Sequence, residues 1–129
     1  MKFDDIFGIH AQALQIRSKR SELLASNLAN ADTPGYKARD INFKEMLNKV
    51  EQDAVRMQTT DKQHIQPDAG LIHPMEILYR TPMQPSLDGN TVDTELEHVA
   101  FSANSMEYQV SLRFLNDKIS GLRKAIRGE

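Results

Sequence analysis

The chain has 129 residues, a length that predicts one structural unit. Its 16 basic and 18 acidic residues give a formal net charge of −2, which argues against general nucleic-acid binding, because phosphate contacts need a basic surface. The absence of Cys excludes disulfides and cysteine nucleophiles, and the absence of Trp argues against a thick globular core. No apolar run approaches the ~20 residues of a membrane span, so no lipid insertion is expected. The first residues lack the pattern of a cleaved signal peptide.

The N-terminal segment has the apolar periodicity of an amphipathic helix from about Asp4 to Asn30. Asp4 and Asp5 fall in its first turn, where the helix dipole favours negative charge. Pro34 and Gly35 prevent the helix from continuing. The residues expected to pack against another long helix are Ile9, Ile16, Leu23 and Leu28.

The C-terminal segment predicts a longer helix from Asp93, as its cap, to Arg127. Its first half carries an apolar stripe at three- and four-residue steps, made of Leu96, Val99, Ala103, Met106 and Val110. Its second half carries a heptad seam suited to knobs-into-holes packing, made of Tyr108, Leu112, Leu115, Ile119, Leu122 and Ile126.

Two partners are possible for this seam. A monomer could pack the seam against its own N-terminal helix. Alternatively, the seam packs between copies of the chain. We favour packing between copies, because two helices this long and thin cannot bury both of their seams in a monomer of 129 residues.

The middle of the chain is broken by turn formers, and all five Pro lie between residues 34 and 85. Asn42-x-x-Glu45 is a capping box for a short helix from Phe43 to Met57. Residues 58–75 are expected to form a loop, and Glu76 to Arg80 a short strand.

The expected fold is therefore mainly α. Two long terminal helices pair as a coiled coil, with a short helix and an irregular segment of loops and a short strand between them. The divisions are an N-terminal helix (1–32), a middle segment (33–90) and a C-terminal helix (91–129), which together form one structural unit.

Catalytic and metal chemistry is hard to find. The tightest His/carboxylate pair is His73-x-x-Glu76, with His64 nearby, but Pro74 prevents it from lying in mid-helix as metal motifs usually do. No nucleophile elbow, phosphate loop or zinc-protease motif occurs. We expect no enzyme activity, no metal and no cofactor.

The segment 24–40 carries the most specific pattern. Asn27 and Asn30 are three residues apart and share a helix face. The side chain of Asn30 or Asp32 could satisfy backbone groups where the helix stops. Ala25 and Ala29, with Ala31, allow another backbone to approach closely.

The residues that follow predict a turn. Pro34 pushes Thr33 towards an extended backbone, and Pro34-Gly35 fits the two central positions of a type II turn. Tyr36 then provides an anchor for the emerging chain. By residue type alone, the whole segment could be a helix stop and nothing more.

The same segment resembles the N-terminal signature of the bacterial flagellar rod and hook proteins. The residues that carry the resemblance are Ser26, Asn27, Leu28, Ala29, Asn30, Ala31, Asp32, Thr33, Pro34, Gly35, Tyr36 and Lys37. The Ala-Asp-Thr-Pro-Gly form, followed by Lys37-Ala38-Arg39-Asp40, resembles the proximal rod members. Residues 89–95 resemble the family's entry into its last helix. The resemblance spans nearly the whole chain and is loose over 41–88.

The resemblance implies a structural subunit of the rod, the axial drive shaft that crosses the periplasm from the membrane ring. In that family the terminal helices pair as an inner coiled-coil layer that stacks helically. The implied partners are copies of the chain, other rod proteins, the junction protein at the membrane ring and the flagellar type III export apparatus.

Members of this family are exported without a cleaved signal, which agrees with the start of this chain. Early export substrates carry a Phe-x-x-x-hydrophobic motif, and Phe3 to Phe7 fits that pattern. Phe3 and Phe7 are also one helical turn apart and could simply pack together.

A rival interpretation is a soluble coiled-coil adaptor or secretion chaperone. Such a protein would form a stable dimer at low concentration. A rod subunit is expected to be a loosely ordered monomer before assembly.

Overall fold

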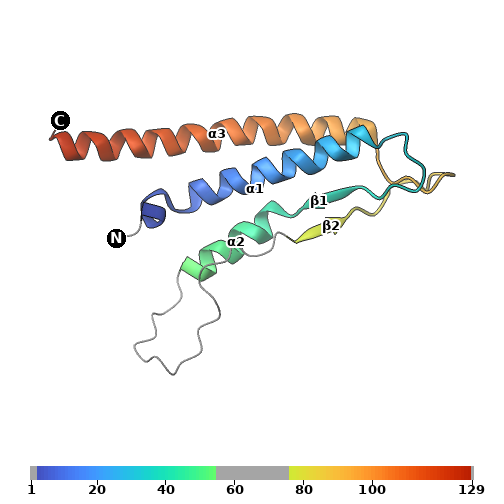
Figure 1. Cartoon of the computed structure of the whole chain (residues 1–129), viewed down its shortest axis with the longest axis horizontal. Coiled ribbons are helices and arrows are strands. Elements are labelled where there is room, and N and C mark those ends of the chain that lie inside the picture. The colour runs from blue at the N-terminus through green and yellow to red at the C-terminus, as the bar shows by residue number, and fades with distance from the viewer. Residues whose placement is uncertain (1–2, 55–75, 129) are drawn as a thin grey trace, which may run out of the picture.

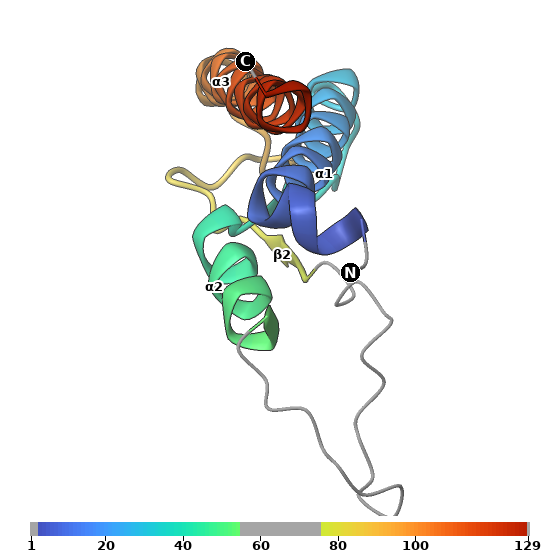
Figure 2. The ribbon, with the colours of Figure 1, turned by 90° about the vertical axis from the view of Figure 1, so that its left-hand side faces the viewer.

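The computed structural model describes residues 3–54 and 76–128, and the side chains of residues 9–49 and 76–128. In chain order its elements are α1 (Phe3–Ala29), β1 (Arg39–Ile41), α2 (Phe43–Ala54), β2 (Ile77–Tyr79) and α3 (Thr94–Arg127). Figure 1 shows α1 and α3 side by side in opposite directions, with β1, β2 and α2 on the other side of α1. The end-on view of Figure 2 shows that α1 has α3 on one side and α2 on the other. The predicted mainly α architecture with paired terminal helices is confirmed.

The ends of α3 are set by local chemistry. Asp93 caps the helix, because its carboxylate accepts hydrogen bonds from the backbone N–H groups of Glu95 (3.1 Å) and Leu96 (3.2 Å). Gly128 ends it with φ 75°, and its N–H donates to the carbonyl of Lys124 at 3.0 Å. The observed bounds agree with those predicted from the sequence.

The other helices also begin where the sequence indicates. The helix α1 ends at Ala29, one residue before the predicted end. The helix α2 starts at Phe43, and the side chain of Asn42 accepts from the N–H of Glu45 at 3.4 Å. The predicted end of α2 at Met57 and the predicted loop 58–75 lie outside the described residues.

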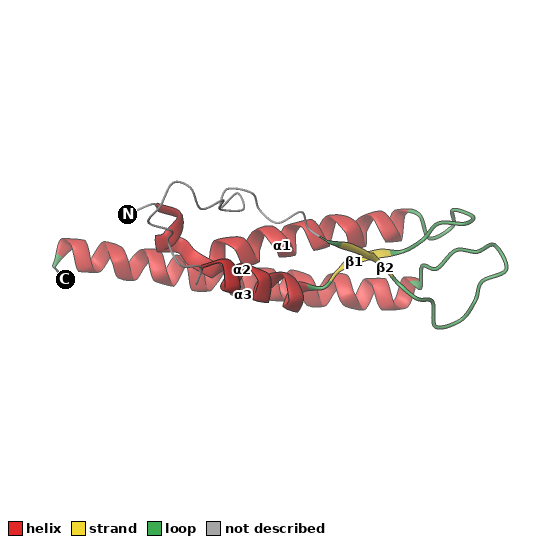
Figure 3. Ribbon diagram, turned by 90° about the horizontal axis from the view of Figure 1, so that it is seen from below, coloured by secondary structure: helices red, strands yellow, loops and turns green. Residues whose placement is uncertain are grey.

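A short antiparallel pair joins β1 to β2, with Asp40 opposite Leu78. The sequence predicted β2 but not β1, which has only three residues and no periodicity of its own. Figure 3 shows β1 leading directly into α2 alongside the two long helices. The pair is extended by a bond from the N–H of Arg80 to the carbonyl of Ala38 (2.9 Å).

The core is small and lies where α1, β1 and α2 meet. It consists of Ile16, Leu23, Ile41 and Met46, with Phe43 packed against it. Each such side chain contributes about 1.5–3 kcal/mol by burial. In contrast, nine large apolar side chains of α3 are exposed. None of the helices described has the apolar length needed to cross a bilayer.

Candidate functional site

The signature residues form the end of α1 and the turn that follows it. The side-chain amide of Asn30 donates to the carbonyl of Ser26 (2.8 Å), and its oxygen accepts from the hydroxyl of Thr33 (3.1 Å). The N–H of Tyr36 donates to the carbonyl of Thr33 (3.3 Å) across the turn, where Gly35 has φ 73°. That φ is the one a type II turn requires at its third residue, and it favours Gly.

The remaining signature residues divide between buried and exposed positions. Leu28 is half-buried, whereas Ala29, Asp32 and Pro34 are exposed. The hydroxyl of Tyr36 lies 3.2 Å from that of Ser26 and donates to Asn27 at 3.4 Å, so Tyr36 packs back on the last turns of α1.

Asn27 is fully buried and holds β1 to α1. Its Nδ2 donates to the carbonyl of Arg39 (2.8 Å), and its Oδ1 accepts from the N–H of Arg39 (3.1 Å). One carboxamide thus pairs with both backbone groups of a strand residue, as a neighbouring strand would. Nδ2 also donates to Glu97 at 3.1 Å, which ties the same group to α3.

Four charged residues form an ion cluster beside Asn27: Arg20, Asp40, Arg80 and Glu97. Arg20 donates to both carboxylate oxygens of Asp40, at 2.9 and 3.1 Å. Arg80 donates to Asp40 at 2.5 Å and to Glu97 at 2.6 Å. The cluster therefore joins α1, β1, the residue after β2, and α3. Glu97 is only 1% exposed, so the bonds to its partners must offset the cost of burying its carboxylate.

The pKa values of Asp40 and Arg20 are shifted within the cluster. Burial alone would raise the pKa of Asp40, but hydrogen bonds from Arg20, Arg80 and the N–H of Ile41 outweigh it and hold this pKa below its usual value. The bond to Asp40 in turn raises the pKa of Arg20. Asp40 is therefore ionised across the physiological pH range.

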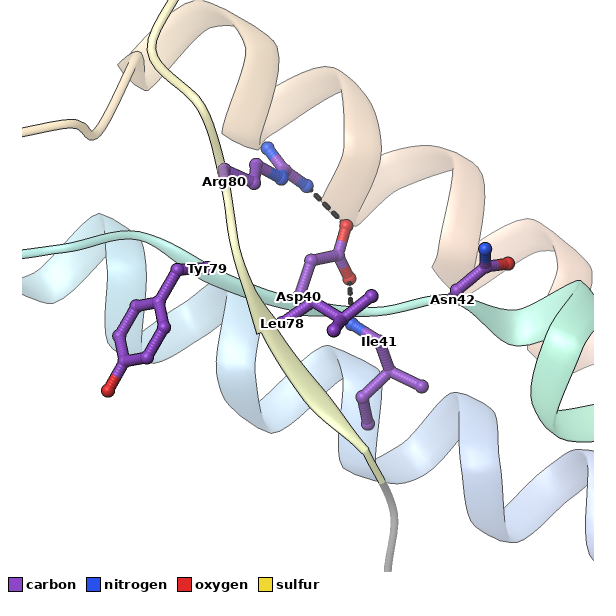
Figure 4. Close-up of a pocket in the computed structure, with 6 residues that line it drawn as sticks. All are labelled: Asp40, Ile41, Asn42, Leu78, Tyr79 and Arg80. Atoms are coloured by element: carbon purple, nitrogen blue, oxygen red, sulfur yellow. Dashed lines mark hydrogen bonds and ion pairs between the residues drawn. The ribbon is translucent and has the colours of Figure 1, made fainter.

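A shallow hollow lies beside the cluster, lined by residues 40–42 and 78–80. Figure 4 shows that Arg80 and Asp40 turn towards each other there, while Tyr79 points away. The charged groups of this hollow are already paired, so it offers no free acid or base.

The His/carboxylate pair considered as a metal site lies partly outside the described residues. Glu76 accepts a hydrogen bond from Lys49 at 2.8 Å, whereas His64 and His73 lie outside the described residues. Within residues 3–54 and 76–128, no three His, Asp or Glu side chains gather as metal ligands would.

The residues that lead into α3 are hydrogen-bonded to the signature turn. The side-chain amide of Asn90 donates to three carbonyls beyond the end of α1, those of Asn30 (3.0 Å), Ala31 (2.7 Å) and Thr33 (2.9 Å). The N–H of Thr91 donates to the carbonyl of Tyr36 at 3.0 Å. The two sequence segments that resemble rod proteins therefore form a single junction.

The contact between α1 and α3 also contains polar groups further along the two helices. The side chain of Asn104, fully buried, donates to the carbonyl of Arg17 (2.9 Å) and to the hydroxyl of Ser21 (2.7 Å). Glu107 pairs with Arg17. Sequence reasoning missed the burial of Glu97 and Asn104; their spacing of seven residues, on the face that later carries Leu115 and Leu122, was the available signal.

The predicted packing residues are unevenly buried. Ile16 and Leu23 lie in the core, and Ile9 and Leu28 are half-buried. On α3, the half-buried members are Tyr108, Leu115 and Ile119, and the exposed members are Leu112, Leu122 and Ile126. Packing of this seam between copies stays a prediction.

Phe3 and Phe7 belong to the first turns of α1. Their side chains lie outside those described, so neither the export motif nor the packing pair is tested.

Comparison with known proteins gives matches along the whole chain. Residues 7–37, which include the signature, match the family described as flagella basal body rod protein. The chain is 53% identical over 133 residues to the flagellar basal body rod protein FlgB of Aeromonas hydrophila, covering 100% of this chain and 98% of that protein. It is 48% identical to FlgB of Cereibacter sphaeroides, covering 98% of each. It is 44% identical to FlgB of Escherichia coli K12, covering 98% of this chain and 96% of that protein.

Proposed function

The chain belongs to the FlgB family of flagellar basal body rod proteins, and on that basis we propose that it builds the proximal segment of the rod. It is a structural subunit of the flagellar basal body rod. Identity to FlgB proteins over the full length carries this conclusion. The adaptor or chaperone alternative has no support among these relatives.

Torque transmission is the proposed mechanical role. A drive shaft must resist slipping between subunits, and many dispersed apolar contacts between helices provide that resistance, each buried Leu or Ile contributing about 1.5–3 kcal/mol. The nine exposed apolar side chains of α3 support this role, because a subunit that works alone has no need of them. Head-to-tail contacts of this kind leave open ends that accept further subunits.

As a rod subunit, the chain assembles with other rod components. Its proposed neighbours are copies of itself, the other proximal rod proteins and the junction protein at the membrane ring. Its proposed location within the basal body is the periplasmic rod, reached through the type III export apparatus without cleavage of a signal. The Phe3–Phe7 motif is the proposed export signal.

Deletion of the gene, followed by electron microscopy of purified basal bodies, tests the proposal. We expect membrane rings without a rod, in a non-motile strain that the gene restores in trans. Complete rods and hooks in the deletion strain would contradict the proposal.

A further inference from the structure

The helix α3 has a second apolar face, which its own chain leaves uncovered. This stripe consists of Leu96, Val99, Met106 and Val110, whose side chains are 46%, 68%, 64% and 52% exposed. The buried side chains that contact α1 along the same stretch are Glu97 and Asn104, and the half-exposed Glu107 reaches Arg17 from the edge of this contact. At 3.6 residues per turn, the stripe lies about 140° around the helix from that contact. The helix α1 of the same chain therefore cannot reach it.

The area of the stripe limits what can cover it. It spans about 21 Å along the helix axis, and a helix is about 10 Å wide, so it offers roughly 200 Å². A stable pair of proteins buries about 800 Å² on each partner. The stripe is therefore too small to hold a free dimer and needs an occupant that other contacts already position. A neighbouring subunit in the rod meets that requirement.

The outward face of α1 carries several small side chains. The residues on this face are Gln15, Ser18, Glu22, Ala25 and Ala29, all exposed and spaced at alternating steps of three and four. They lie opposite the face of α1 that carries Ile16, Leu23 and Asn27 into the interior. Three of the five are Ser or Ala, which let a second helix approach closely enough to be contacted by large side chains.

We propose that the α3 stripe of one copy packs against the outward face of α1 of the next copy. The two surfaces lie on different helices of the molecule, so the contact is head-to-tail and can repeat from copy to copy, and it leaves open ends where its rotation does not close a ring. Pairing of two α3 stripes about a two-fold axis would instead close into a dimer and end growth. This inference rests on the proposed function and specifies which surfaces of the rod subunit meet.

Disulfide cross-linking tests the contact directly, because the natural chain has no Cys. Met106→Cys is combined in turn with Gln15→Cys, Ser18→Cys, Glu22→Cys and Ala25→Cys. These four positions follow one another along about 15 Å of the same helix face, so they sample the alignments in which Met106 lies against this part of α1. We expect disulfide-linked multimers of the chain in basal bodies purified from a complemented deletion strain.

The matched control is Gln109→Cys, an exposed residue of α3 about 60° further from the stripe axis than Met106. Combined with the same α1 variants, it is expected to give no linked multimers. Linked multimers of the Met106→Cys single variant would show that α3 packs against α3 of another copy. A link from Met106→Cys to a different rod protein would show that this protein, and not a second copy of the chain, covers the stripe. Either result overturns the inference.

A charge substitution separates this inference from the proposed function. Met106→Asp puts a carboxylate into the contact, and we expect incorporation into basal bodies to fall tenfold or more, because a buried unpaired charge is costly. Gln109→Asp should leave incorporation unchanged. Because Met106 is exposed in the free chain, both variants should unfold at the same urea concentration as the wild type.

The outcomes are distinguishable. If the wild-type gene fails to restore rods, the proposed function is wrong. If the wild type and both Asp variants restore rods equally, the rod function stands and the packing of the stripe on α1 is wrong.

Discussion

Asn27 links three elements through one side chain. Its carboxamide pairs with both backbone groups of Arg39 and with the buried carboxylate of Glu97. Asp lacks the donor that this pairing needs, Leu lacks both the donor and the acceptor, and Ser carries both on a single oxygen rather than on two separate atoms. This geometry gives a physical reason for an Asn at this position of the signature, beyond ending a helix.

Asn27→Ala should lower the free energy of unfolding by about 2–4 kcal/mol, because it removes the partner of both backbone groups of Arg39 and one of the two partners of the buried Glu97. The measurement is the urea unfolding midpoint followed by circular dichroism. Asn116→Ala, at an exposed position of α3, is the control and should be neutral or slightly stabilising. Equal midpoints for the wild type and Asn27→Ala would show that the pairing contributes nothing.

The ion cluster predicts a dependence of stability on pH. The pKa of Asp40 in the folded chain lies below its unfolded value of about 3.9, because Arg20 and Arg80 outweigh the effect of burial. Its contribution to stability is therefore complete above pH 4 and is lost as the pH falls through the folded pKa.

Asp40→Asn should remove this contribution at neutral pH, about 1.5–3 kcal/mol for hydrogen bonds to charged groups, and should flatten the decline of stability below pH 4. Unfolding free energies measured from pH 7 to pH 3 test both statements. Asp117→Asn, at an exposed site, should follow the wild-type curve. A variant curve parallel to the wild type would mean that another carboxylate causes the decline.

The export motif is a separate prediction at the level of single residues. Phe7→Asp should stop secretion of the chain, because the hydrophobic position of the motif becomes charged. Phe7→Leu keeps a hydrophobic side chain and should be secreted. Immunoblots of periplasmic and culture fractions compare the two. Normal secretion of Phe7→Asp would leave Phe3 and Phe7 as a packing pair only.

At the scale of the elements, the helices were predictable because their signals are local. Asp93 caps α3 within three residues, and Pro34 and Gly35 follow the end of α1 directly. The strand β1 was missed, because three residues show no periodicity and their partner lies 38 residues away.

The candidate site was only half predictable. The signature segment, including Asn27 and Asn30, could be identified by its residue types. The ion cluster could not, because Asp40 lies 20 and 40 residues from Arg20 and Arg80, and no local spacing reports such a contact. Glu97 reads in the sequence as an ordinary first-turn acid, and its partners, Asn27 and Arg80, lie 70 and 17 residues away.

Substitution by Ala is expected to have opposite effects on stability at Gly89 and at Gly121. Gly89 has φ 75° in the junction, where a Cβ would find space 3.8 Å from Gly35 Cα. The conformation alone therefore makes Gly89→Ala destabilising, by about 1–2 kcal/mol. Gly121 lies inside α3, and outside its own helix turns no atom of the described residues comes within 4 Å of a Cβ added there, so Gly121→Ala should stabilise by about 0.5–1 kcal/mol. Thermal unfolding of both variants checks the signs, and a shift in the same direction for both would contradict them.

At the scale of the whole molecule, α3 extends past α1. Three pairs of residues fix the register of the two helices: Asn27 contacts Glu97, Arg17 contacts Glu107, and the rings of His10 and Phe114 lie 5.9 Å apart. From one pair to the next, α1 runs back by ten and then seven residues, and α3 runs forward by the same numbers. Continued at this register, Leu122 and Ile126 lie beyond Phe3, where α1 begins. This agrees with their exposed fractions of 39% and 87%.

The overhanging end of α3 gives the seam its proposed role between subunits. A Leu that its own chain leaves open adds little to the folding of the monomer, and a neighbouring helix that covers it gains about 1.5–3 kcal/mol. Leu122→Asp should therefore block rod assembly while leaving the chain folded and exported. Asn116→Asp adds the same charge at an exposed position off the seam and should assemble.

Motility assays, electron microscopy of basal bodies and immunoblots of the exported fraction separate assembly from export. Motile cells with normal rods from Leu122→Asp would show that the seam makes no contact between subunits that assembly needs. In that case the contacts that transmit torque would have to lie elsewhere on α3, and the uncovered stripe around Met106 is the next surface to carry them.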